Sequence, residues 1–367
     1  MDNQVRTAFI DIDNLFVNNQ INDISEQKNG FRDLLIRSMN RNKICVELLE
    51  HFKISYNKKG KDFTEVIFNS EISTNDIHEF IKKYAKANRL KDEDRIYLQD
   101  QLSRLKYFDW GGTYQNALEK TIVNNFVKKY KSYDEINKHI ESSILDSVRG
   151  YTLSSWYNHW STILLEDLFS DIDEITPAVG KVQKIDFFIK KIPFDLKVTY
   201  FPDEFMEQEL KRKNFGVELT QIKKACRICG ISIPTDLTGK RLKEHLYTKL
   251  SESTDTNAKN FIIQLKQLKE GIISECKKDA TSLKTWLYEN QGEKRFDASN
   301  RFFIVLIDQQ NMYDSWKLKR NIMLIKKSIE EKVKNISENL DNLKLSFYWK
   351  QDHKTYNVIS DLLFISK

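Results

Sequence analysis

The sequence predicts an α/β fold, with a mixed β-sheet flanked by helices and a mainly α-helical N-terminal domain before it. Two observations carry this prediction. In the first 150 residues, apolar side chains recur at helical spacing among charges, at 31–51, 77–105 and 114–145. After residue 150 the pattern changes to one helix, three short strands, further helices and a buried strand. We therefore expect two domains, at residues 1–150 and 151–367.

In chain order, the first element expected is a short strand at residues 7–13. Ser154 and Ser155 suit the start of a helix whose apolar and aromatic positions run from Trp156 to Leu168. Three strand-like runs follow in quick succession, at 172–179, 182–189 and 193–201.

The remaining elements complete the predicted sheet and its helical layers. Helices are expected at 203–227, 238–250, 257–288 and 315–340. The continuous apolar run at 302–307 is typical of a strand buried on both faces. Two final strands, at 343–349 and 356–365, predict a hairpin.

Composition limits the class of protein. The chain has 367 residues, of which 40% are apolar, enough to bury a sizeable core. The net charge is +1 over residues 1–150 and +5 over the remainder, so the C-terminal part is better suited to a polyanion. Four cysteines are too few for a disulfide framework. With no apolar run of membrane-spanning length, we expect a cytoplasmic protein that does not associate with membranes.

The chemically informative segment lies at residues 184–199. If Lys190 and Lys191 form a two-residue turn, Asp186 faces Asp195 across a hairpin, and directly opposed Cβ atoms are roughly 4.5–5.5 Å apart. Lys197 lies two residues beyond Asp195, on the same face of the strand. The pattern therefore predicts two acids and a lysine gathered on one face.

Such an arrangement is electrostatically costly without a cation. Directly opposed like charges repel, and apolar neighbours such as Phe188 strengthen the repulsion by lowering the local dielectric. A divalent cation between the carboxylates removes the repulsion, and Mg²⁺ prefers one or two carboxylates together with water and phosphate oxygens. A metal ion and a lysine beside a phosphodiester can stabilise the negative charge that develops in the transition state of its hydrolysis. The alternative is an edge hairpin whose charges face solvent.

Asp186 followed by Asp195-Leu196-Lys197 on the next strand resembles the PD-(D/E)XK nuclease superfamily, which includes many restriction endonucleases. Acid-x-lysine also occurs elsewhere in this chain, so the hairpin setting and the second acid carry the resemblance. It implies a restriction-endonuclease-like core and cleavage of DNA that depends on Mg²⁺, or on Mn²⁺. Asp186, Asp195 and the Leu196 carbonyl would be metal ligands, and Lys197 would lie beside the attacking water.

The same resemblance implies an acid from the preceding helix. Glu166 is at the matching position as a further catalytic residue and metal ligand, and Asp167 and Glu174 are alternatives for this role. His159 lies on the same helical stripe, where it would approach a phosphate or simply face solvent.

The expected partner is DNA. Basic side chains beside the predicted site would contribute the salt-sensitive part of binding, or would be ordinary solvated charges; they are Lys181, Lys184, Lys317, Lys319 and Arg320. The superfamily suggests a restriction or antiphage defence nuclease, acting as a homodimer or as a subunit of a defence complex, with residues 1–150 for recognition or regulation. The alternative is a non-catalytic DNA-binding or scaffold subunit that keeps the fold.

One further pattern suggests a different metal. Cys226 and Cys229 have the spacing of half a zinc site. No second close pair of cysteines occurs in the sequence, so a structural zinc is not expected.

Overall fold

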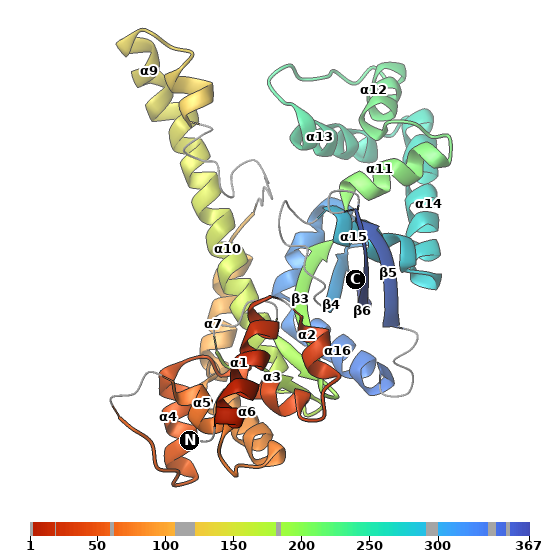
Figure 1. The fold of residues 1–367 in the computed structure, drawn as a ribbon. Helices are drawn as coiled ribbons and strands as arrows, with labels where there is room; N and C mark the ends of the chain where they lie inside the picture. The colour runs from red at the N-terminus through yellow and green to blue at the C-terminus, as the bar shows by residue number, and fades with distance from the viewer. Residues whose placement is uncertain are drawn as a thin grey trace. The chain divides into compact units, whose positions relative to one another are not determined.

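The computed structural model describes residues 3–18, 20–58, 62–106, 122–180, 185–290, 300–336, 343–349 and 353–367 (Figure 1). The chain forms two compact units, and neither is one continuous stretch of sequence. Unit 1 comprises Met1–Lys28, Pro193–Ser315 and Asn335–Lys367. Unit 2 comprises Asn29–Ile192 and Trp316–Lys334.

Unit 2 is mostly helical. Its first helices are α3 (Gly30–Ser38), α4 (Asn42–His51), α5 (Phe63–Phe68), α6 (Thr74–Asn88) and α7 (Asp92–Ser103). These are followed by η1 (Val123–Val127), α9 (Tyr133–His139), η2 (Ile140–Ile144) and the long helix α10 (Leu145–Phe169). The expected helices at 31–51 and 77–105 are therefore present, each divided in two. The helix expected at 114–145 begins outside the described residues and is helical from residue 122 except for a short turn before α9.

Two short strands complete the core of unit 2. Strand β1 (Ile175–Pro177) pairs antiparallel with β2 (Phe187–Ile189), so that Ile175 is opposite Ile189. Phe187 stacks on Phe169 at the end of α10, with ring centroids 4.5 Å apart. The apolar pair Phe187-Phe188 is therefore buried, as the sequence predicts.

Unit 1 contains the longer strands. Strand β3 (Ile192–Tyr200) is parallel to β4 (Arg301–Ile307), which is parallel to β6 (Lys354–Ser366). Strand β5 (Lys344–Trp349) pairs antiparallel with β6, which confirms the C-terminal hairpin. Every residue of β4 is buried, as expected for a central strand.

Unit 1 also contains helices, some of which pack on the sheet. They are α1 (Asn3–Val17), α2 (Ile21–Ser25), α11 (Asp203–Arg212), α12 (Glu218–Ile228), α13 (Gly239–Glu252), α14 (Thr256–Lys278) and α15 (Thr281–Asn290). A 3-10 helix, η3 (Met312–Arg320), and α16 (Ile322–Ile336) run on from unit 1 into unit 2 and back. The face of β4 that carries Phe303, Val305 and Ile307 packs in one cluster with residues of α11, α14 and α15.

The described strands follow the order β1-β2-β3-β4-β6-β5 in a six-stranded sheet. The protein is thus an α/β protein with a mixed sheet flanked by helices, as predicted. No helix among the described residues is long and apolar enough to cross a membrane.

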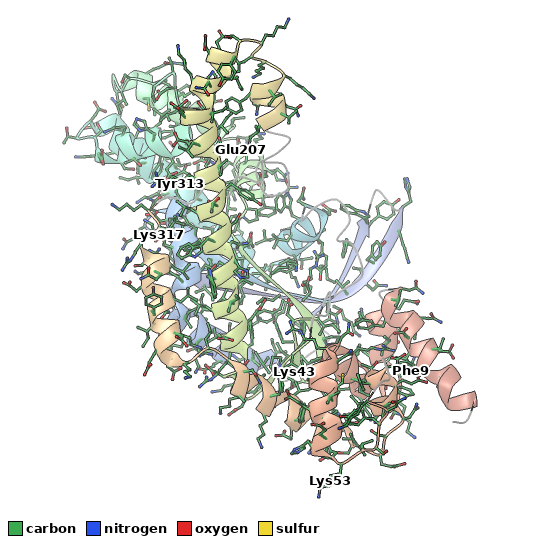
Figure 2. All side chains as sticks on the ribbon, turned by 90° about the vertical axis from the view of Figure 1, so that its left-hand side faces the viewer. Phe9, Lys43, Lys53, Glu207, Tyr313 and Lys317 are labelled. Carbon is green, nitrogen blue, oxygen red and sulfur yellow. The ribbon has the colours of Figure 1, made fainter. Side chains whose placement is uncertain are left out.

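The strand expected at residues 7–13 is wrong, because these residues belong to helix α1 (Figure 2). Phe9 and Ile12 are buried, whereas Ile10 is 47% exposed. Apolar residues three apart share one face of a helix, and this face decides the structure here.

The predicted domain boundary at residue 150 falls inside helix α10. The compact units instead divide the chain after Lys28 and after Ile192. The apolar pattern changes near residue 150, but helix α10 continues through this position, so the change does not mark a boundary between units. The separate functions expected of residues 1–150 (recognition or regulation) and of residues 151–367 (cleavage) stay a prediction.

Candidate active site

Strand β3 brings together the acid and the lysine of the predicted motif. The Lys197 Nζ atom donates a hydrogen bond of 2.5 Å to Asp195 Oδ1. Asp195 is buried, whereas the Lys197 side chain is 25% exposed. The prediction that these two side chains share one face of the strand is confirmed, because successive side chains of a strand alternate between faces.

The neighbouring side chains fix this orientation. Phe194 points to the opposite face of the sheet, where its ring lies edge-on to Phe302 at 6.2 Å between centroids. Directly after the end of β3, Phe201 joins the apolar cluster that also holds Phe303 of β4. Burial of aromatic rings on both faces of the sheet prevents the strand from rotating, so Asp195 and Lys197 have a defined direction.

Two polar residues that the sequence analysis did not single out lie at the start of β4. The Asn300 side chain donates to the Pro193 carbonyl (3.1 Å) and accepts from the Ile359 N–H (2.9 Å), so it joins β3 to β6. Arg301 is opposite Asp195 in the parallel ladder, and its Nε atom lies 3.6 Å from Asp195 Oδ2. The sequence signal that could have identified Asn300 and Arg301 is their position directly before the continuous apolar run at 302–307.

Asp186 belongs to unit 2 and precedes β2. It is half-buried, and its carbonyl accepts the Ala178 N–H at 2.9 Å. The predicted two-residue turn is confirmed, because Lys190 and Lys191 have φ values of 47° and 77° between β2 and β3. Positive φ at both positions is typical of a tight hairpin turn. The opposition of Asp186 and Asp195 stays a prediction.

Glu166 lies near the C-terminal end of α10 in unit 2 and is exposed. Its pKa is raised, chiefly because neighbouring protein atoms displace part of the water around the carboxyl group and then by Asp167, although His159 and Lys319 act in the opposite direction. Its approach to Asp186 stays a prediction. Glu174, one of its alternatives, is exposed before β1.

The other alternative, Asp167, has a structural role. Its carboxylate accepts the Leu90 N–H at 2.8 Å and lies 3.7 Å from Arg95, which also pairs with Asp171 at 2.6 Å. These contacts hold helix α7 against α10. They leave Glu166 as the better candidate of the two.

Lys319 is not the surface cation that the sequence suggested. It is only 4% exposed, and its ammonium donates to Asn158 Oδ1 (2.6 Å) and Thr162 Oγ1 (3.0 Å) on α10. Burial lowers its pKa to about 7, although Glu166 acts to raise it. A phosphate contact by Lys319 is therefore excluded by its burial within unit 2.

The remaining basic candidates differ in their surroundings. The Arg320 guanidinium donates to the Leu102 carbonyl (2.8 Å), so it is held at the end of α7. Lys317 (Figure 2) is half-exposed. Its ammonium lies 5.8 Å from the Trp316 ring centroid. Lys181 and Lys184 lie outside the described residues.

A metal ion at the predicted site would be bound by oxygen atoms. Carboxylate and carbonyl oxygens are the donors that Mg²⁺ and Mn²⁺ prefer, and Mg²⁺ needs only one or two protein carboxylates. Over the described part of the chain, no three His, Cys, Asp or Glu side chains gather as a metal-binding group. The Lys197 ammonium already occupies a cation position at Asp195 Oδ1. Asp195 thus offers carboxylate oxygens of the kind that Mg²⁺ prefers, and metal binding at this position stays a prediction.

Cys226 and Cys229 lie at the end of α12. Cys226 is buried in an apolar cluster with Ile222 and Leu246, and burial raises its pKa. The Cys229 thiol donates to Asp255 Oδ1 at 3.5 Å. Both side chains thus have contacts within unit 1 that account for their positions.

No protein family, no curated protein and no solved structure matches this chain.

Proposed function

We propose that this chain is a metal-dependent nuclease that hydrolyses DNA phosphodiester bonds. The observation that carries the proposal is the pairing of Asp195 with Lys197 on one face of the buried strand β3. A second support is the tight turn at Lys190–Lys191, which matches the hairpin the motif requires.

A restriction-endonuclease-like core is part of this proposal. Helix α10 is followed by strands β1, β2 and β3, then by helices, and then by β4, which is parallel to β3. The resemblance implies a core of one helix, three strands, a helix and a further strand, and this order is similar to it except that several helices lie between β3 and β4.

The residues of the proposed site divide into ligands and a cationic partner. Asp186 and Asp195 would hold the metal ion, with the Leu196 carbonyl and Glu166 as further ligands. The ion, when bound, supplies a positive charge that polarises the scissile phosphate. Because its side chain is partly exposed, Lys197 has room to leave Asp195 and approach the attacking water and the phosphate. A lysine in that place stabilises the negative charge that grows in the transition state.

The proposed setting is a restriction or antiphage defence system. Cleavage of both strands of a duplex requires two sites, so we expect a homodimer or a larger defence complex. Of the basic candidates that the sequence analysis named and the structure describes, Lys317 remains the best candidate for a phosphate contact.

The decisive experiment is incubation of the full chain with supercoiled plasmid DNA in Mg²⁺, in Mn²⁺ and in chelator. We expect nicking or linearisation only with metal, and loss of cleavage in Asp195→Asn and in Asp186→Asn. Asp173→Asn, which changes an exposed acid of unit 2, is the matched control and should cut normally. Cleavage that persists in chelator or in both site variants would overturn the proposal.

The same purified protein also distinguishes the proposed nuclease from a scaffold that binds DNA without cutting it. A gel-shift titration in Ca²⁺ measures binding apart from cleavage. Binding without any metal-dependent cleavage would favour the scaffold function.

A further inference from the structure

Arg301 occupies an unusual position for a charged residue. It is the first residue of the central strand β4 and is 1% exposed. In the parallel ladder it is opposite Asp195, and the distance from its Nε atom to Asp195 Oδ2 is 3.6 Å. A buried arginine needs a counter-charge, because isolated charges are costly in a protein interior.

The Arg301 side chain is held in place from the α15 side. Its guanidinium lies over the Tyr288 ring, with 4.7 Å between Cζ and the ring centroid. The Tyr288 ring is itself packed against Phe303 (5.4 Å) and Phe347 (4.8 Å). A planar guanidinium that lies over a packed, buried ring has less freedom to withdraw from Asp195 than one in solvent.

The two oxygens of Asp195 therefore face different cations. Oδ1 is hydrogen-bonded to Lys197, which is partly exposed. Oδ2 faces Arg301, which is fixed and buried. Among the described residues, Lys197 is the more exposed of these two cations, so a ligand from solvent would reach Asp195 on the Lys197 side.

We propose that Arg301 is a positioning residue, which holds Oδ2 of Asp195 so that Oδ1 alone is presented to a divalent cation. This inference rests on the proposed nuclease function. Single-oxygen binding suits Mg²⁺, which demands near-octahedral geometry, whereas Ca²⁺ also accepts both oxygens of one carboxylate. Arg301 thereby favours the smaller ion over Ca²⁺.

A purely structural Arg301 would have a different signature. Removing one buried positive charge changes the affinity for any divalent cation in the same direction and by a similar factor, since the charges of the ions are equal. The ratio of Mn²⁺ to Ca²⁺ affinity cancels this effect. Loss of carboxylate orientation changes the ratio.

The test is calorimetric titration of the wild-type chain and of Arg301→Gln with Mn²⁺ and, separately, with Ca²⁺. Mn²⁺ stands in for Mg²⁺ because it binds more tightly to oxygen and nitrogen ligands. We expect the Mn²⁺-to-Ca²⁺ affinity ratio to fall roughly tenfold or more in Arg301→Gln, as is typical for the loss of a residue that supports a metal ligand. An unchanged ratio would overturn the role of Arg301.

The matched control is Lys284→Met. Lys284 is another buried cation of unit 1, and its ammonium donates to the Ser360 carbonyl at 3.2 Å. Its replacement also removes one interior positive charge, but it should leave the affinity ratio unchanged. A fall in the ratio equal to that of Arg301→Gln would overturn the inference.

Two further measurements test the inference, and the first of them keeps it testable if Arg301→Gln folds poorly. Arg301→Lys keeps the charge but not the fixed plane, so the affinity ratio should still fall, by less than in Arg301→Gln. In urea unfolding without metal, the loss of midpoint caused by Arg301→Gln should shrink by more than half in an Asp195→Asn background, because the two residues act as a pair. Equal losses in both backgrounds, or a wild-type ratio in Arg301→Lys, would contradict the inference.

Failure of this inference differs from failure of the proposed function. A wild-type chain that binds no Mn²⁺ and cuts no DNA overturns both. A wild-type chain that binds Mn²⁺ and cuts DNA, with an unchanged ratio in Arg301→Gln, overturns the role of Arg301 alone.

Discussion

The Nζ atom of Lys197 lies 2.5 Å from Oδ1 of Asp195, in a hydrogen bond between a partly exposed ammonium and a buried carboxylate. A charge-assisted hydrogen bond of this kind is stronger than a neutral one. Lys197 is thus the counter-ion of Asp195 in this structure, and in the proposed nuclease it would also be a cation for the transition state.

Replacement of Lys197 by Met should lower the cleavage rate about 100-fold or more, as for the loss of an electrostatic stabiliser. Interactions made only in the transition state lower turnover without weakening binding. DNA affinity in Ca²⁺ should therefore stay close to the wild-type value, and single-turnover cleavage in Mg²⁺ with gel shifts in Ca²⁺ measures both. A variant that binds far more weakly yet cuts at the normal rate when saturated would make Lys197 a DNA-binding lysine instead.

The same variant should bind Mn²⁺ more tightly than the wild type. Lys197 competes with a metal ion for Asp195 Oδ1, and a hydrogen bond to a charged group is worth about 1.5–3 kcal/mol. Removal of this competitor should strengthen Mn²⁺ binding on the order of tenfold. Titration calorimetry without DNA gives the comparison, and Lys213→Met, an exposed pair with Glu275, serves as control. Weaker Mn²⁺ binding in Lys197→Met would show that Lys197 does not compete with the ion.

Local patterns in the sequence predicted the parts of the site that depend on neighbouring residues. The alternation of Phe194, Asp195, Leu196 and Lys197 fixes which side chains share a face of β3. The apolar run at 302–307 likewise predicts β4 within one residue. Both follow from periodicity over a few residues.

Contacts between distant residues were not accessible in the same way. Lys319 is buried against helix α10, where its ammonium donates a hydrogen bond to Asn158, which is 161 residues away in the sequence. Arg301 is opposite Asp195 only because β3 and β4 pair in parallel across the intervening helices. A single sequence gives these lysine and arginine residues the appearance of surface charges, and only the packed fold assigns them to the interior.

Gly180 has a close approach that a larger residue cannot make. Its N–H donates to the Ser38 carbonyl at 2.6 Å, and a Cβ atom there would lie 2.5 Å from the same oxygen. Gly180→Ala should therefore lower the free energy of unfolding by about 1–3 kcal/mol, as for an overpacked site. Gly150→Ala is the matched control: its Cβ would meet nothing within 4 Å on helix α10, so a gain of about 0.5–1 kcal/mol is expected. Urea unfolding that gives both variants the same sign would contradict this account.

Lys319 should make the stability of the protein depend on pH. Burial lowers its pKa to about 7 in the folded chain, against 10.5 for an ordinary lysine, and Glu166 is the charged group that opposes this shift. Between these two values the unfolded chain binds a proton that the folded chain does not. The free energy of unfolding therefore rises with pH in this window, by up to about 1.4 kcal/mol per pH unit, and the penalty is largest below pH 7.

Lys319→Met should remove this dependence, because methionine fills the space without a charge. The measurement is urea unfolding of wild type and variant at pH 6.5, 7.5 and 8.5, with the difference between the two proteins taken at each pH so that other titrating groups cancel. We expect the stability of the wild type relative to the variant to increase as the pH rises. Lys317→Met, which changes a half-exposed neighbour on the same 3-10 helix, should instead run parallel to the wild type. If the Lys319→Met curve is also parallel, the ammonium is solvated in the folded chain and its burial against Asn158 and Thr162 is wrong.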